Sequence, residues 1–134
     1  MKLLRRRFLY LAVGATALPA SRIAMAQAYP TRPVRLIVGF PPSGYIDTAA
    51  KLIGQWLSDR LGQQFVIENR SGASSNIATA DVVRALADGC TLLTVSDVNA
   101  YNATLFDKLN FNFIRDVAPV ASIASVPFVM VPHK

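Results

Sequence analysis

Two segments near the start of the chain show contrasting patterns of apolar residues. Residues 34–40 form a nearly continuous apolar run, which is typical of a strand covered on both faces. Apolar residues then recur at helical spacing over residues 49–61, and Gly62 follows where a helix commonly ends. We therefore predict a strand that leads into an amphipathic helix, with Asp47 or Thr48 as the N-cap.

The same two patterns repeat along the rest of the chain. Further helices are predicted at residues 77–87 and 97–106. Further strands are predicted at residues 65–67, 91–96 and 120–131, where the last stretch holds one or two strands around Pro127. Because strands and helices alternate with short connections, the strands should be parallel, with helices on both faces. The sequence therefore predicts an α/β fold with a doubly wound, mostly parallel sheet.

Three polar loops accompany these predicted strands, at residues 41–47, 71–76 and 96–102. In open sheets of this kind, ligands bind at the carboxyl ends of the strands. Helix N-termini at that edge offer free backbone N–H groups and about half a positive charge, which suits a carboxylate. We therefore expect a site for a small anion there.

Uncharged hydrogen-bond donors dominate these loops. The candidates to contact a solute are Ser43, Gly44 and Tyr45 on the first loop, and Ser74, Ser75 and Asn76 before the second helix. The alternative is that the serines and Asn76 only cap the helices that follow them, as such residues do in most proteins. The residue types alone leave both interpretations open.

Asp97 and four aromatic residues complete the set of candidates. Asp97 is either an ordinary loop acid or N-cap, or a contact for a cationic group of the solute. Phe40 and Phe106 fit the core better than a ligand wall. Tyr45 lies in a polar loop and favours the site, whereas Tyr101 fits either role.

Several enzyme and cofactor classes are disfavoured by missing motifs. Residues 39–44 (GFPPSG) lack the G-x-G-x-x-G spacing of dinucleotide sites, and the sequence has no Walker A, H-E-x-x-H or G-x-S-x-G motif. A serine hydrolase would depend on His133, the sole histidine, as its base. Cys90 is the sole cysteine and is expected to be a buried thiol. We expect no enzyme activity, no metal and no cofactor.

The positive charge is concentrated at the N-terminus. Five of the 14 Lys and Arg residues lie in residues 1–26, which contain no acid, and the other nine face eight Asp and Glu. Nucleic acid is therefore not an expected partner. Residues 1–26 combine a basic start, an apolar run of about 11 residues and an Ala-Met-Ala end, which predicts a cleaved signal peptide. Export by the Tat or Sec route to the periplasm is expected, and an uncleaved anchor is the alternative.

Several motifs in register resemble one family of transport proteins. They include residues 29–38 (YPTRPVRLIV), 40–47 (FPPSGYID) and 61–70 (LGQQFVIENR), and shorter matches at 72–77, 88–93, 102–106 and 115–120. Together these motifs are similar to the Bug receptors, the extracytoplasmic solute-binding subunits of tripartite tricarboxylate transporters. The resemblance implies a two-lobed periplasmic binding protein (type II) fold and capture of small carboxylates for membrane permease subunits.

The resemblance also implies a division of the chain and a set of ligand-contacting residues. Residues 27–134 would form part of the first lobe, because family members are roughly two to three times longer, so the fold is expected to be truncated. The expected contacts are Phe40, Ser43, Gly44, Tyr45, Asp47, Ser74, Ser75, Asn76, Ser96, Asp97 and Asn102.

Two departures from the family pattern affect this expectation. Ser43, Tyr45 and Ile46 interrupt the usual glycine run of the first loop, and Ser74-Ser75 replace a Gly-Gly pair. Asp97 adds a negative charge, which makes an amino-acid-like solute an alternative to a di- or tricarboxylate. Two other functions stay open: a remnant without useful affinity, and an exported sensor or interaction module that uses a sheet edge or apolar face.

Overall fold

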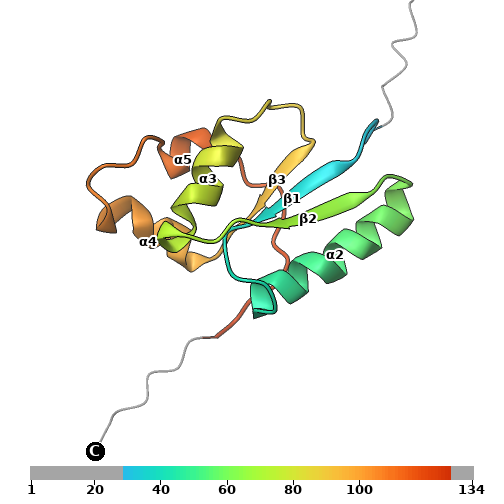
Figure 1. Cartoon of the computed structure of the whole chain (residues 1–134), viewed down its shortest axis with the longest axis horizontal. Coiled ribbons are helices and arrows are strands. Elements are labelled where there is room, and N and C mark those ends of the chain that lie inside the picture. The colour runs from blue at the N-terminus through green and yellow to red at the C-terminus, as the bar shows by residue number, and fades with distance from the viewer. Residues whose placement is uncertain (1–28, 128–134) are drawn as a thin grey trace, which may run out of the picture.

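The computed structural model of the chain describes residues 29–127 (Figure 1). The predicted signal peptide, His133 and the last part of the predicted 120–131 strands lie outside this range. The strands are β1 (Val34–Val38), β2 (Phe65–Asn69) and β3 (Thr91–Thr94). The helices are α2 (Tyr45–Leu61), the 3₁₀ turn η1 (Ala73–Ser75), α3 (Asn76–Val83), α4 (Asp97–Leu105) and α5 (Phe113–Asp116).

The three strands form one parallel sheet in the order β2-β1-β3. At its carboxyl end, Val38 of β1 stands opposite Asn69 of β2 on one side and Thr94 of β3 on the other. The connection after β2 therefore crosses over β1 before the chain reaches β3. This reversal places a topological switch point between β1 and β3, where sheets of this type bind ligands. The predicted α/β class with parallel strands is confirmed.

The central strand β1 is covered on both faces. Leu36 and Val38 pack with Ile46 and Ala50 of α2 in the main apolar cluster. Ile37 points to the opposite face, which α3 covers, and is 1% exposed. Figure 1 shows α2 and α3 on opposite sides of the sheet. The continuous apolar pattern of β1 thus reflects burial from two sides, as predicted.

The C-terminal end of α2 agrees with the prediction, and its N-terminal end does not. Gly62 adopts a left-handed conformation (φ 69°), and its N–H donates to the carbonyl of Ser58 at 3.0 Å, as expected for a C-terminal glycine. The predicted N-cap was wrong, because α2 begins at Tyr45 with the extended Gly44 before it. Asp47 lies inside the first turn and interacts with the loop that precedes the helix.

Three other predicted elements are corrected. Helix α3 ends at Val83 rather than residue 87, because the N–H of Ala85 turns back to the carbonyl of Val82 in a tighter turn. Strand β3 ends at Thr94 rather than residue 96, and α5 lies in a stretch for which no helix was predicted. Residues 120–127 form no strand, because no described strand pairs with them and a strand requires such a partner.

The end of β1 approaches the start of α3 very closely. A Cβ atom at Gly39 would lie 1.8 Å from the Oγ of Ser75 and 2.6 Å from its Cβ. These distances are far below van der Waals contact, so only glycine fits between the sheet and this serine. Within residues 29–127, no helix is long and apolar enough to cross a membrane.

We predict that Gly39→Ala lowers the free energy of unfolding by about 2 kcal/mol, because the added methyl group overpacks this contact. Ser75→Gly removes the two overlapping atoms, so the double variant should be more stable than Gly39→Ala alone. Gly44→Ala is the matched control, since its Cβ would meet only the carbonyl of Pro41 at 3.5 Å. Equal losses for both alanine variants in urea unfolding would contradict the prediction.

Candidate solute site

The three predicted loops meet at the carboxyl edge of the sheet. The first is joined to β2 by Asn69, whose Nδ2 donates to the Oδ1 of Asp47 at 2.8 Å and to the carbonyl of Phe40 at 3.3 Å. The second is joined to α4 by Asn99 and Asn102, which donate to Ser75 and Ser74. The structure therefore brings together residues from segments up to about 60 positions apart in the sequence.

Asp47 organises the first loop through a fully buried carboxylate. Its Oδ2 accepts from the Nζ of Lys51 at 2.7 Å and from the N–H of Ser43 at 2.8 Å, and its Oδ1 accepts from Asn69. The hydrogen bonds from Lys51, Asn69 and Ser43 together lower the pKa of Asp47 to about 2. The carboxylate is thus a structural anchor for the loop and stays ionised at neutral pH.

The hydrogen bonds to Asp47 determine which groups of the first loop remain free to contact a solute. The backbone N–H of Ser43, with φ at 70°, already donates to Asp47. The carbonyl of Gly44 accepts from the N–H and Oγ1 of Thr48 within α2. Tyr45 is 67% exposed at the start of the helix. Of the first-loop candidates, the side chains of Ser43 and Tyr45 lie on the surface, whereas Asp47 is enclosed.

The second loop has an unusual backbone. Gly72, Ala73, Ser74 and Ser75 have φ values of 141°, 45°, 53° and 72° in succession. The left-handed region costs a residue with a side chain about 1–2 kcal/mol. Ser74 and Ser75 thus adopt conformations that glycine would adopt without strain, where the sequence already departs from the family's Gly-Gly pair. Such strain persists only where neighbouring contacts hold it in place.

Two asparagines of α4 hold this strained loop. The Nδ2 of Asn102 donates to the carbonyl of Ser74 at 2.6 Å. The Nδ2 of Asn99 donates to the Oγ of Ser75 at 3.1 Å and to the Oγ1 of Thr79 at 3.2 Å. Ser75 occupies the N-cap position of α3, as the capping interpretation expected, but its side chain makes no capping hydrogen bond.

Asn99 was not among the predicted site residues. Its Oδ1 accepts from the N–H of Ser96, so one side chain joins the third loop to the second. The spacing Ser96-x-x-Asn99 is that of a helix N-cap and its N3 residue, and this local pattern was the available clue. The hydrogen bonds from Asn99 to Ser75 and Thr79 join residues 24 and 20 positions apart, so no local sequence pattern indicates them.

Four buried polar side-chain atoms of the described region have no hydrogen-bond partner within it. They are the Oγ1 of Thr94, the Oγ of Ser96, the Oδ1 of Asn102 and the Nδ2 of Asn76. They belong to the last residue of β3 (Thr94), to the N-terminal ends of α3 (Asn76) and α4 (Ser96), and to the second turn of α4 (Asn102). Native proteins leave few buried polar groups unpaired, so water or a solute is expected to complete the hydrogen bonds of these atoms. Thr94 was also missed by the sequence analysis.

The remaining candidates occupy different environments. Asp97 is the first residue of α4, half-buried, and Ser96 rather than Asp97 is the N-cap. Phe40 packs against the main apolar cluster, as predicted. Phe106 is 40% exposed, so its prediction as a core residue was wrong, and Tyr101 is 55% exposed. Cys90 is buried, as predicted.

A family model described as "Tripartite tricarboxylate transporter family receptor" matches residues 49–134 of the chain. The chain therefore belongs to this family of transporter receptors. Protein BugT of Bordetella pertussis is 36% identical over 127 residues, which cover 93% of this chain and 38% of that protein. A protein from the TAR-I ttuE-ttuC' intergenic region of Agrobacterium vitis is 37% identical, with 96% and 37% covered.

Solved structures of periplasmic binding proteins share the fold. MatC from Rhodopseudomonas palustris with bound malate is 36% identical and matches with a TM-score of 0.66, which covers 71% of this chain and 33% of that one. A TctC solute-binding protein from Polaromonas without ligand matches at 0.53 and 29% identity, with 60% and 28% covered. The chain thus spans somewhat more than a third of the length of the curated relatives it matches.

We predict that the stability of the protein falls as the pH drops from about 4 towards about 2, in part because Asp47 takes up a proton there. The folded pKa lies below the ordinary value of 3.8, so the ionised form stabilises the fold above that pH and the contribution disappears below it. The Asp47→Asn variant should lack this part of the pH dependence in urea unfolding series. An unchanged pH profile in the variant would show that Asp47 does not supply it.

We further predict that Ser74→Gly raises the free energy of unfolding by about 0.5–1 kcal/mol, because relief of left-handed strain exceeds the greater freedom of glycine in the unfolded chain. Ser74 is exposed, and its bond to Asn102 uses the backbone carbonyl, which glycine retains. Ala103→Gly, at an exposed position of α4, is the control and should lose about 1 kcal/mol. A loss of stability in both variants would contradict the strain argument.

Proposed function

We propose that this chain provides one wall of the solute site of a tripartite tricarboxylate transporter receptor, which captures small carboxylates for uptake. The observation that carries the proposal is the cluster of buried, unpartnered polar atoms at the switch point, formed by Thr94, Ser96 and Asn102. The hydroxyl groups of Thr94 and Ser96 can donate to a carboxylate oxygen that reaches them, whereas the Oδ1 of Asn102 can only accept, as from a hydroxyl or ammonium group of the solute.

The electrostatics of the same edge favour a small anion. The N-termini of α2 and α4 lie there, and each contributes partial positive charge and free N–H groups. Lys51 is paired with Asp47, so the candidate loops hold an anion through neutral donors rather than through a free cation. The malate bound to the related MatC structure supports this choice of solute class.

The same proposal includes the cellular location and the partners of the protein. Residues 1–26 would direct export by the Tat or Sec route and be removed, and residues 27–134 would form part of the first lobe in the periplasm. Membrane permease subunits would receive the captured solute. The receptor would act by binding alone, without catalysis, metal or cofactor.

Asp97 supports a narrower alternative for the solute. Its carboxylate begins α4 next to Ser96, so a solute with an ammonium group beside its carboxylate would meet a favourable charge. An amino-acid-like solute such as aspartate is therefore the second candidate. The Asp97→Asn variant replaces this carboxylate by an amide and so distinguishes a dicarboxylate from an amino-acid-like solute.

We predict that malate binds this chain with a dissociation constant in the millimolar range, about −4 kcal/mol, because the described loops enclose a solute from one side only. Two-dimensional NMR should show saturable shifts of the Gly44 and Ser96 amides. Thr94→Val and Ser96→Ala should each weaken binding about tenfold, since each removes a hydrogen bond to a charged group. Asp97→Asn should strengthen malate binding and weaken aspartate binding.

Ser71→Ala, an exposed serine of the second loop, is the matched control and should leave malate binding unchanged. Thr94→Val should not lower the stability, because its hydroxyl is buried without a partner in the described region. Binding that survives both Thr94→Val and Ser96→Ala would remove the switch point as the solute site.

A further inference from the structure

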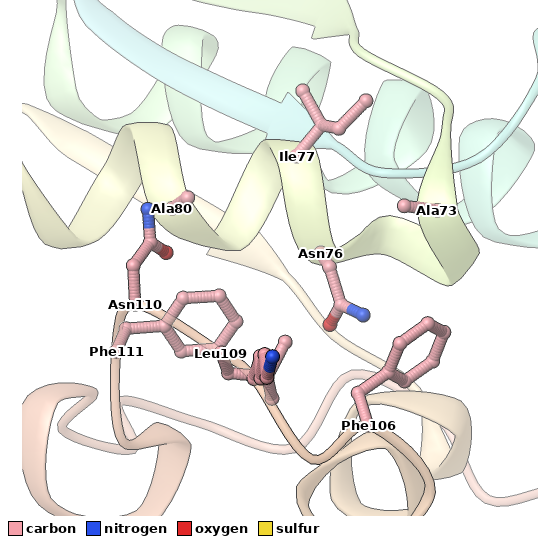
Figure 2. A pocket seen from close by; sticks show the side chains of 9 residues that line it. Ala73, Asn76, Ile77, Ala80, Phe106, Leu109, Asn110 and Phe111 are labelled. Carbon is pink, nitrogen blue, oxygen red and sulfur yellow. The ribbon is translucent and has the colours of Figure 1, made fainter.

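A mostly apolar groove of about 370 Å³ lies between α3 and the segment that follows α4, and Ala73 and Asn76 of the second loop form part of its lining. One side consists of Ala73, Asn76, Ile77 and Ala80, and the other of Phe106, Lys108, Leu109, Asn110 and Phe111. Figure 2 shows Asn76 projecting from α3 toward the segment that carries Phe106, Leu109 and Phe111. The volume is at the lower end of the range of small-molecule sites.

The orientation of the Asn76 amide follows from a chain of hydrogen bonds. The carbonyl of Ser74 can only accept, so the atom of Asn102 that approaches it at 2.6 Å must be the donor Nδ2. The same Nδ2 lies 2.9 Å from Asn76, which must therefore present its Oδ1 as acceptor. The Nδ2 of Asn76 is thus left without a partner among residues 29–127, although the residue is only 8% exposed.

The groove therefore combines three properties of a ligand site. Its apolar wall includes two phenylalanine rings, its buried end carries an unused amide donor, and the cationic Lys108 stands on its lining. A buried unpaired donor is costly unless a ligand accepts from it. A carboxylate attached to a small apolar body would pair with the lysine and bury its body against the rings, and a small shift of the Asn76 side chain would let it accept from the buried donor.

We propose that this groove is a second binding site, for a small monocarboxylate with an aromatic or branched apolar body. The site is distinct from the switch point, because its lining shares only Asn76 with the residues expected to contact the main solute. The proposal rests on the groove itself and does not depend on the proposed receptor function.

Benzoate is the probe that tests the proposal. We expect saturable NMR shifts of the Asn76 side-chain amide and of the Ala80 and Phe106 backbone amides, with a dissociation constant in the low millimolar range. Benzamide keeps the ring without the charge, and acetate keeps the charge without the ring. Both should bind much more weakly than benzoate, because the site needs both parts of the ligand.

Three variants examine the three properties separately. Ala80→Leu fills the groove and should weaken benzoate at least about tenfold. Asn76→Asp keeps the acceptor for Asn102 and replaces the free donor by a negative oxygen, so it should abolish binding. Lys108→Gln should weaken binding about fivefold, since it removes an exposed charge. Arg60→Gln, which removes one exposed charge from α2, is the control and should have no effect.

The outcomes separate this proposal from the proposed function. Benzoate shifts confined to Gly44 and Ser96 would overturn the second site and leave the main one standing. Benzoate shifts at Asn76 and Ala80, together with no response to malate, would support the groove and count against the receptor proposal. Shifts that do not saturate, or that persist in Ala80→Leu, would overturn the groove.

Discussion

The carboxylate of Asp47 is the interaction on which the geometry of the candidate site depends. It receives hydrogen bonds from the first loop, from the helix that the loop opens and from the end of the neighbouring strand. One buried charge thereby fixes the direction in which the chain leaves β1 and enters α2. A buried charge is tolerated only when its hydrogen bonds are complete. The hydrogen bonds of Asp47 also hold the first loop, α2 and the end of β2 in position relative to one another.

The second loop is held by neutral amide groups rather than by a buried charge. Successive left-handed residues raise the energy of the loop, and amide groups of α4 compensate by binding the carbonyl of Ser74 and the hydroxyl of Ser75. Gly39 completes the arrangement because no larger residue fits against Ser75. The site edge therefore joins a first loop with one left-handed residue, Ser43, held by a buried ion, and a second loop with several left-handed residues, held by neutral dipoles.

The parts of the fold that the sequence predicted are those determined locally. Three patterns depend only on residues close together in the sequence, and the structure agrees with all of them. They are the apolar run of β1, the helical spacing of α2 and the glycine at position 62. The role of Asp47 was not predicted, because its partner Asn69 lies 22 positions away and no local pattern links them. The bonds from Asn99 to Ser75 and Thr79 likewise join residues 24 and 20 positions apart, and Thr94 was missed because its hydroxyl has no partner within the described region. Residues 120–127 looked like a strand because their composition is apolar, but pairing depends on a neighbour that composition does not specify.

The position of β1 in the sheet has a consequence for the order of assembly. It is the first of the described strands to be synthesised, yet its second neighbour, β3, arrives only after about 50 further residues. Until then, a strand that is apolar on both faces keeps one unpaired edge open to other chains. The pairing with β2 forms over a shorter loop and so encounters a smaller entropic barrier than the pairing with β3. The central strand of the core therefore gains its second neighbour late, and association between nascent chains through its open edge is the hazard that the β2-β1-β3 order carries.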